Sequence, residues 1–421
     1  KLYIGILLVI FGGIVLHAPL SVGLGTLFPA YDLLIKSWKE ILMLLAGVLA
    51  IVVLSQHKKL TILKEPLMIG IAVFALLHIV SVAYFGGTPE QLVAGLMIDL
   101  RYILFFALVY IAMRLYPGYQ KVFIRVGIAG ALVVVVFALL QVFILPVDIL
   151  KYIGYNSSTI MPYLTVDQNT DFIRINSTLR GPNPLGAYAL MTLTILTAWI
   201  VANKPNLRKK PLLIVAVVFV GSIVALWASY SRSALLATAV AVGIVLLVLT
   251  FKRHKYVVLA IAAVALIVGT VGLTVGRDNS FISNVILHEN PDDNNNVNSN
   301  DGHISSLQDG LNRMISQPFG AGVGSTGSAS LYGNEPLVIE NQYLLIAHEV
   351  GWLGLILFVM IFVGVLARLW QRRSDWLALG VFASGVGLAV IGLLLPVWVD
   401  DTVAIIWWGL AAVAIGTRRH D

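Results

Sequence analysis

The sequence predicts an all-α, polytopic membrane protein with about 12 transmembrane helices. The chain is 59% hydrophobic and only 12% charged, whereas soluble domains carry about 25% charged residues. Apolar runs near the 20 residues that a helix needs to cross a bilayer recur along the whole chain. A transmembrane β-barrel would instead show short segments of alternating polarity.

Each predicted span is an apolar run of roughly 17–25 residues. The runs cover residues 3–17, 38–55, 66–84, 93–113, 121–145, 184–203, 211–229, 233–251, 256–276, 341–366, 377–397 and 402–417. The first run has no small-residue cleavage site, so we expect it to remain as a span rather than to be removed as a signal peptide.

The charges in the connecting loops alternate along the chain. Every second loop is basic, and the basic residues are Lys58, Lys59, Lys64, Arg114, Lys121, Lys204, Arg208, Lys209, Lys210, Lys252, Arg253, Lys255, Arg368, Arg372, Arg373, Arg418 and Arg419. The positive-inside rule places these loops and both termini in the cytoplasm. The net charge of +7 therefore reflects the basic loops on the cytoplasmic side of the membrane. We expect no nucleic acid as a partner.

Two long loops face away from the predicted cytoplasmic side, at residues 146–183 and 277–340. The larger loop lies between helices 9 and 10 and divides the chain into residues 1–276, 277–340 and 341–421. Its first part is polar, at residues 290–302. Apolar residues at 304, 307, 311, 314 and 315 then predict a helix, and a glycine-rich turn follows at residues 317–324.

Four arginines on this outward side are candidates for binding an anion: Arg174, Arg180, Arg232 and Arg313. A guanidinium at the centre of a span costs roughly 2.5–3.5 kcal/mol, so Arg232, which lies between two apolar runs, should face a polar cavity or an anionic partner. Guanidinium groups bind phosphate oxygens in pairs, and several converging on one cavity would form a diphosphate site. Arg174 and Arg313 could equally be solvated loop charges.

Glu340 is the first candidate for a general base, because it begins span 10 on the outward side. A carboxylate there could take a proton from an acceptor hydroxyl, or it could be an N-terminal charge favoured by the helix dipole, with Asn341 helping. His303 is a second candidate base. His348 lies eight residues beyond Glu340 and close to the same helical face, so it could line the cavity or be a buried structural residue.

The other ionisable residues of the spans have structural interpretations. We expect Arg101 to pair with Asp99 or with another helix. Asp400 and Asp401 flank the start of span 12 and could be N-terminal charges or could orient one of the arginines.

The sequence predicts no metal site and no cofactor. No cysteine is present, the outward carboxylates form no cluster with ligand spacing, and no Walker motif is found, which argues against ATP as the energy source. The glycines at 320, 322 and 324 could cradle an anion through their amides, although such spacing alone is a weak signal.

Four stretches together give the chain a resemblance to the superfamily of O-antigen ligases and polymerases. They are Ser231-Arg-Ser-Ala-Leu-Leu, Arg180-Gly-Pro-Asn-Pro-Leu-Gly, the segment from Gly302-His to Pro318-Phe-Gly-Ala-Gly-Val-Gly, and Glu340-Asn followed by Gly351-x-x-Gly. Their order, the span count and the late outer loop extend the match over most of the chain.

The resemblance implies an inverting, metal-independent glycosyltransferase of the bacterial inner (plasma) membrane. Its donor would be a glycan on a polyprenyl diphosphate in the lipid bilayer, and its acceptor a glycan hydroxyl at the extracytoplasmic leaflet. By position in the motifs, Arg180 and Arg232 would hold the diphosphate, with Arg174 and Arg313 as further candidates. Glu340 or His303 would be the base, with Asn341, His348 and Asp401 in support.

One residue departs from the ligase pattern. Ligases that load glycan onto lipid A usually carry His at the position held here by Glu340, so the resemblance favours a polymerase that joins repeat units. A ligase to lipid A core or another envelope acceptor is the alternative. A lipid-linked oligosaccharide transporter would instead place its ionisable residues at the bilayer midplane, and a non-catalytic scaffold would need no convergent arginines.

Overall fold

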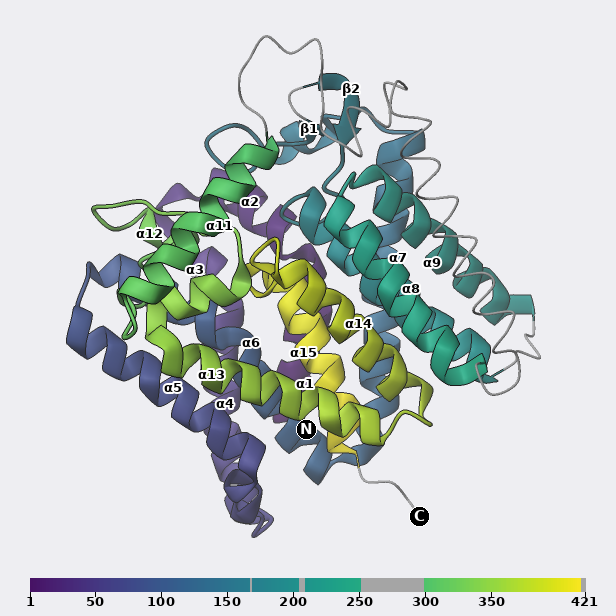
Figure 1. Ribbon diagram of the computed structural model, residues 1–421. Helices are drawn as coiled ribbons and strands as arrows, with labels where there is room; N and C mark the ends of the chain where they lie inside the picture. The colour runs from purple at the N-terminus through teal and green to yellow at the C-terminus, as the bar shows by residue number, and fades with distance from the viewer. Residues whose placement is uncertain (167–168, 204–208, 251–298, 418–421) are drawn as a thin grey trace.

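The computed structural model describes residues 1–421 except 167–168, 204–208, 251–298 and 418–421, and it is mostly helical (Figure 1). The first half contains α1 (Leu2–Gly13), α2 (His17–Leu27), α3 (Asp32–Lys36), α4 (Trp38–Gln56), α5 (Pro66–Phe85), α6 (Pro89–Leu115) and α7 (Gln120–Phe143). The second half contains α8 (Pro182–Asn203), α9 (Lys209–Ala228), a helix over Arg232–Thr250, α11 (Ser299–Ser316), α12 (Gly327–Ser330), α13 (Gln342–Gln371), α14 (Trp376–Gly392) and α15 (Asp401–Gly416).

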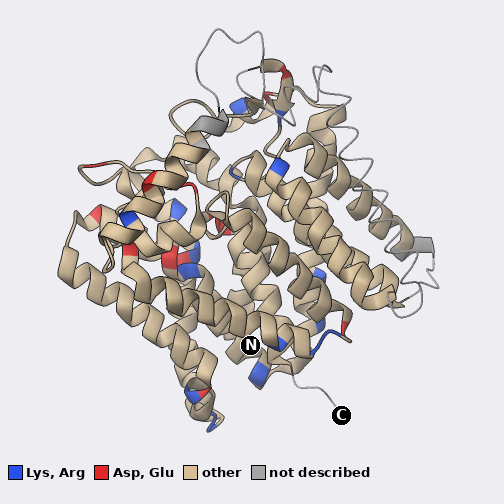
Figure 2. Cartoon of the chain, in the orientation of Figure 1, with Lys and Arg blue, Asp and Glu red and all other residues tan. Residues whose placement is uncertain are grey.

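The membrane-spanning character of the chain is confirmed in its main lines. Within the described residues, eight helical segments are long and apolar enough to cross a bilayer, and three shorter apolar helices accompany them at Leu212–Ala228, Trp376–Gly392 and Asp401–Gly416. The expected span at 256–276 lies outside the described residues, so the count of about 12 stays a prediction. Figure 2 shows that the long helices carry few charged residues.

The loop at 146–183 contains structure that an all-α prediction did not include. Strand β1 (Leu164–Val166) pairs antiparallel with β2 (Asn169–Arg174), with Leu164 opposite Arg174. The short hairpin lies at the same end of the molecule as α11 and α12, opposite the turn between α4 and α5 (Figure 1). The helix expected near residues 304–315 is present as α11.

The core is centred on α6 and α15, which pack along each other. All residues of α15 from Thr402 to Gly416 are buried. Gly409 permits the close approach, because a Cβ there would lie 2.9 Å from Phe105, as is common where small residues bring membrane helices together. An aromatic cluster lies in this core. The ring centroids of Trp407 and Trp408 are 5.1 Å apart, and those of Trp398 and Trp407 are 5.3 Å apart.

Helix α13 is broken near its middle, and the glycine-rich turn fills the break. Val350 and Gly351 have non-helical dihedral angles. The turn supplies amides to the freed carbonyls, from Ala321 to His348 and from Gly322 to Glu349, while the amide of Trp352 donates to the Pro318 carbonyl at 2.9 Å. Such substitutes are required because an unsatisfied backbone group in an apolar interior costs several kcal/mol.

Gly351→Ala should destabilise the protein. Gly351 has φ +71°, and a Cβ there would lie 2.6 Å from the Phe319 carbonyl carbon, so the substitution adds steric overlap to backbone strain of about 1–3 kcal/mol. We expect a lower midpoint of thermal unfolding in detergent, followed by tryptophan fluorescence. Gly47→Ala is the matched control, because nothing lies within 4 Å of its Cβ position; equal midpoints for the two variants would contradict the prediction.

Candidate functional site

The candidate site lies where segments distant in sequence meet at the end of the molecule that carries α11, α12 and the β1–β2 hairpin (Figure 1). These segments are the loop before α8, the turn after α9, the α12 loop, and the first residues of α13 and of α15. The contacts described below connect several of these segments, and each candidate side chain comes from a different part of the chain.

Arg180 is at the centre of these contacts. Its guanidinium donates to Ser328 Oγ on α12 at 3.3 Å, and its charge acts on Asp400. The side chain is exposed, whereas the loop that presents it is buried and fixed. In that loop Ser177 has φ +51° and is held by bonds from its amide to Gln141 Oε1 and from its Oγ to the Val134 carbonyl, both at 2.7 Å.

Arg174 connects the hairpin to two neighbouring segments. Its Nε donates to the Ser229 carbonyl at 2.9 Å, and one terminal nitrogen donates to Asn183 Oδ1 at 2.6 Å. These bonds connect the end of β2 to the start of α8 and to the turn that precedes Arg232. They give Arg174 a positioning role, while its proposed diphosphate contact stays a prediction.

Arg232 is half-buried at the start of the helix Arg232–Thr250. The turn before it is strained, because Tyr230 has φ +46°, and non-glycine residues in this region often mark functional sites. The same turn packs tightly on α8, since a Cβ on Gly186 would lie 2.8 Å from Ala234 Cβ and 3.1 Å from Ser231 Cβ. The segments that carry Arg180 and Arg232 are therefore in direct contact.

The start of α13 is held by a cap within the helix and by hydrogen bonds to two other segments. Asn341 is buried and caps the helix by accepting from the amides of Tyr343 and Leu344, and its Nδ2 donates to the Leu393 carbonyl at 2.7 Å. The half-buried Glu340 donates its amide to Ser306 Oγ of α11 at 3.2 Å. The capping role expected for Asn341 is thus present, and the candidate base is positioned by α11.

The other candidates on this side are placed differently. Arg313 forms an ion pair with Asp309, one turn earlier on α11, at 2.7 Å on a partly exposed face, which is the solvated arrangement considered for it. His303 is in the first turns of α11, but its side chain lies outside the described residues. His348 is buried near the break in α13, and its Nδ1 has no hydrogen-bond partner among the described residues.

Asp99 and Glu349 form a buried carboxyl pair, and this pairing is one that the sequence did not suggest. Both line a small pocket together with Thr326 and Ser328, and Ser328 is the residue that accepts a hydrogen bond from Arg180. Ser328 therefore lies between the pocket and Arg180. Of the two partners expected for Arg101, Asp99 or another helix, the second is present, because Arg101 pairs with Asp401 of α15. Asp99 instead lies 3.8 Å from His78 Nε2.

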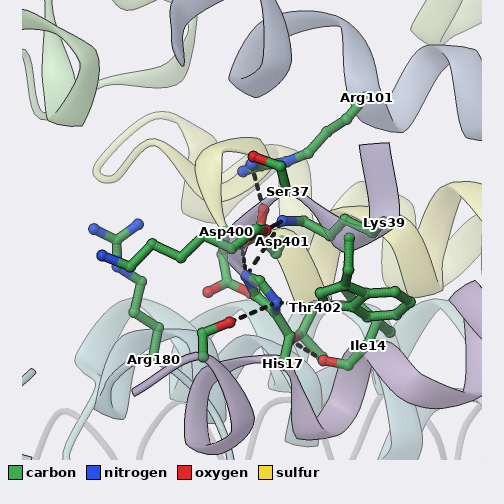
Figure 3. A network of polar contacts seen from close by, with 12 residues as sticks. Ile14, His17, Ser37, Lys39, Arg101, Arg180, Asp400, Asp401 and Thr402 are labelled. Atoms are coloured by element: carbon green, nitrogen blue, oxygen red, sulfur yellow. Dashed lines mark hydrogen bonds and ion pairs between the residues drawn. The ribbon is translucent and has the colours of Figure 1, made fainter. Parts of the chain in front are cut away.

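Arg101 pairs with Asp401 of α15, within a buried network of polar side chains (Figure 3). Asp401 Oδ2 also lies 3.0 Å from His17 Nε2 and 3.7 Å from Lys39 Nζ. The indole of Trp38 donates to His17 Nδ1 at 3.0 Å, and Lys39 Nζ lies 3.2 Å from His17 Nε2. Asp401 pairs with an arginine and is also the acidic residue in the first turn of α15, so both interpretations of Asp401 are present.

Asp400 connects this network to Arg180. Its carboxylate caps α15 by accepting from the Val403 amide at 2.9 Å. Burial raises the pKa of Asp400, while the charges of Arg180 and Arg101 act to lower it. Figure 3 shows Arg180 at the edge of the network, next to Asp400. The arrangement provides fixed positive charge at a water-facing position, which can bind an anion such as a diphosphate.

Among the described residues, no group of three or more His, Cys, Asp or Glu side chains is arranged to hold a metal ion.

A comparison with protein families gives one match. Residues 217–359 match the Wzy_C family, which is described as O-antigen ligase. The matched segment contains Arg232, the α12 loop, Glu340 and the break in α13, whereas Arg174 and Arg180 precede it. No curated protein matches the chain significantly.

Asp401→Asn should destabilise the protein strongly. The change leaves Arg101 and Lys39, whose side chains are 6% and 4% exposed, without their shared carboxylate, and removing one partner of a buried ion pair costs about 3–5 kcal/mol. Thermal unfolding in detergent measures the effect. The control is Asp32→Asn, which removes an exposed pair with Lys36 worth at most about 1 kcal/mol; a smaller effect for Asp401→Asn than for the control would refute the network's structural role.

Proposed function

Because the chain belongs to the O-antigen ligase and polymerase superfamily, we propose that it joins polysaccharide repeat units carried on a polyprenyl diphosphate. The transfer is an inverting, metal-independent glycosyl transfer at the extracytoplasmic leaflet of the inner membrane. The observation that carries the proposal is the contact between the Arg180 and Arg232 segments at one end of a multi-pass helical bundle.

The proposed reaction is a single displacement. Glu340 takes the proton of the acceptor hydroxyl, and the oxygen attacks the anomeric carbon of the donor glycan. The bond between that carbon and the diphosphate oxygen breaks, and the electron pair leaves with the polyprenyl diphosphate. One displacement at the anomeric carbon inverts its configuration.

Arg180 and Arg232 would stabilise the charge that develops on the departing diphosphate. Fixed cations are most effective when they are already oriented before charge develops, and both arginines are presented by turns with strained backbones. Arg180 has a hydroxyl as its closest described partner, at 3.3 Å, which a phosphate oxygen could replace. Glu340 precedes the first turn of α13, where the helix dipole favours its ionised form.

A ligase is the second candidate, and the description of the matching family favours it. Glu340 in place of the histidine typical of lipid A ligases favours the polymerase. Purified protein supplied with lipid-linked repeat units alone separates the two. Longer lipid-linked chains would support polymerisation, whereas product that forms only after addition of a lipid A core acceptor would establish a ligase.

Arg232→Ala should lower the rate of glycan transfer about 100-fold or more, by analogy with the loss of one donor to a developing anion. Arg232→Lys should recover only part of the activity, because an ammonium cannot form the paired contacts of a guanidinium. Gel analysis of chain growth on lipid-linked substrate measures both. Arg125→Ala removes an exposed charge of α7 and should leave transfer unchanged; normal transfer by Arg232→Ala would remove that residue from the mechanism.

Glu340→Gln should abolish transfer while donor binding is retained, since the amide keeps the shape and loses the basic oxygen. Glutamine has nearly the size and shape of glutamate, and the bond to Ser306 comes from the main-chain amide of residue 340, which the variant keeps. Transfer and binding of the lipid-linked donor are measured on the same preparation. An active Glu340→Gln variant together with an inactive His303→Ala variant would assign the base to His303.

A further inference from the structure

Helix α11 presents three different faces. At about 100° per residue, Ser306, Gly310 and Met314 share the side that packs on α13. Gly310 is buried there, because a Cβ on it would lie 3.0 Å from Leu344 Cδ1, and Ser306 accepts the hydrogen bond from the Glu340 amide. A second side is polar and exposed, and it carries Ser305, Gln308, Asp309, Asn312 and Ser316.

The third face of α11 is apolar and exposed. Ile304, Leu307, Leu311 and Ile315 recur at the spacing of one helical stripe, and they are 55%, 40%, 40% and 66% exposed among the described residues. The stripe lies between the side packed on α13 and the polar side. A helix with an apolar and a polar face of this kind is typical of a membrane–water interface.

Three exposed aromatic side chains lie near the C-terminal end of α11. Phe319 is 82% exposed, Tyr84 at the end of α5 is 79% exposed, and Trp352 beyond the break in α13 is 47% exposed. Trp352 is fixed against α11, since its indole nitrogen donates to the Met314 carbonyl at 2.6 Å. Aromatic residues gather where a membrane surface meets water, because their rings are apolar and their polar atoms remain hydrated.

The helix on which α11 packs is itself apolar and exposed beyond Trp352. Below Trp352, Leu353 and Ile356 of α13 are 57% and 54% exposed, as expected of side chains that face lipid. In Figure 1, α11 runs across the direction of α8 and α9 instead of along it. We propose that α11 lies in the headgroup region of the adjacent membrane leaflet, with Ile304, Leu307, Leu311 and Ile315 buried among acyl chains.

This placement goes beyond the proposed function and does not depend on it. Lipid is the occupant that fits, because Trp352, whose indole bonds to α11, is followed directly along α13 by exposed apolar residues. Since α11 also binds the Glu340 amide through Ser306, its contact with the leaflet would fix the height of the start of α13 above the membrane.

Fluorescent labelling tests the proposal directly, because the chain contains no cysteine. Single variants Leu307→Cys and Leu311→Cys probe the apolar stripe, and Asp309→Cys and Asn312→Cys on the polar side are the matched controls. Each is labelled with an environment-sensitive dye in the full chain and reconstituted in vesicles of phosphatidylcholine and phosphatidylglycerol. Quenching by lipid with a nitroxide near the headgroup is compared with quenching by aqueous iodide.

We expect labels at 307 and 311 to be quenched by nitroxide lipid about threefold more than labels at 309 and 312, with the reverse order for iodide. Equal iodide quenching at all four positions would overturn the proposal, because the stripe would then face water. Protection of 307 and 311 from both quenchers would also overturn it, because protein would then cover the stripe.

Discussion

The candidate site depends on the break in α13. A membrane helix can be interrupted only where other groups satisfy the freed carbonyls, and here the turn at residues 318–322 provides the amides. Because the turn is attached to α11 on one side and leads to α12 on the other, closing the break positions both. Gly320, Gly322 and Gly351 all have positive φ, and a Cβ on Gly320 or Gly351 would meet backbone within 2.7 Å.

The buried charges follow from a related constraint. A charge among apolar helices is tolerated only with a partner, and Asp401 supplies one carboxylate to Arg101 and Lys39 at once. This network joins α2, α4, α6 and α15 beside the segment that carries Asp400. Arg180 therefore extends from a loop towards this buried network of paired charges, and its side chain remains exposed.

The sequence was sufficient for the features that repeat or that carry a local chemical signal. Apolar run length predicted the multi-pass helical character of the chain, helical spacing predicted α11, and the cap at Asn341 followed from its position. It could not give the partner of Arg101, because Asp99, two residues away on α6, was as plausible by chemistry as Asp401, which is 300 residues away. It also missed the hairpin at 164–174 and the Asp99–Glu349 pair, since both depend on contacts between distant segments.

Contacts between distant segments also bring together the two short motifs that contain Arg180 and Arg232. The motif at Arg180 precedes the matched family segment and the motif at Arg232 lies within it, yet Arg174 forms hydrogen bonds with both neighbourhoods, through Asn183 and Ser229. Arg174, which the sequence predicts to bind the diphosphate, thereby helps to fix the distance between the segments that carry Arg180 and Arg232. Under the proposed function, loss of Arg174 would weaken diphosphate binding by moving the segments that carry Arg180 and Arg232, without any contact between Arg174 and a phosphate.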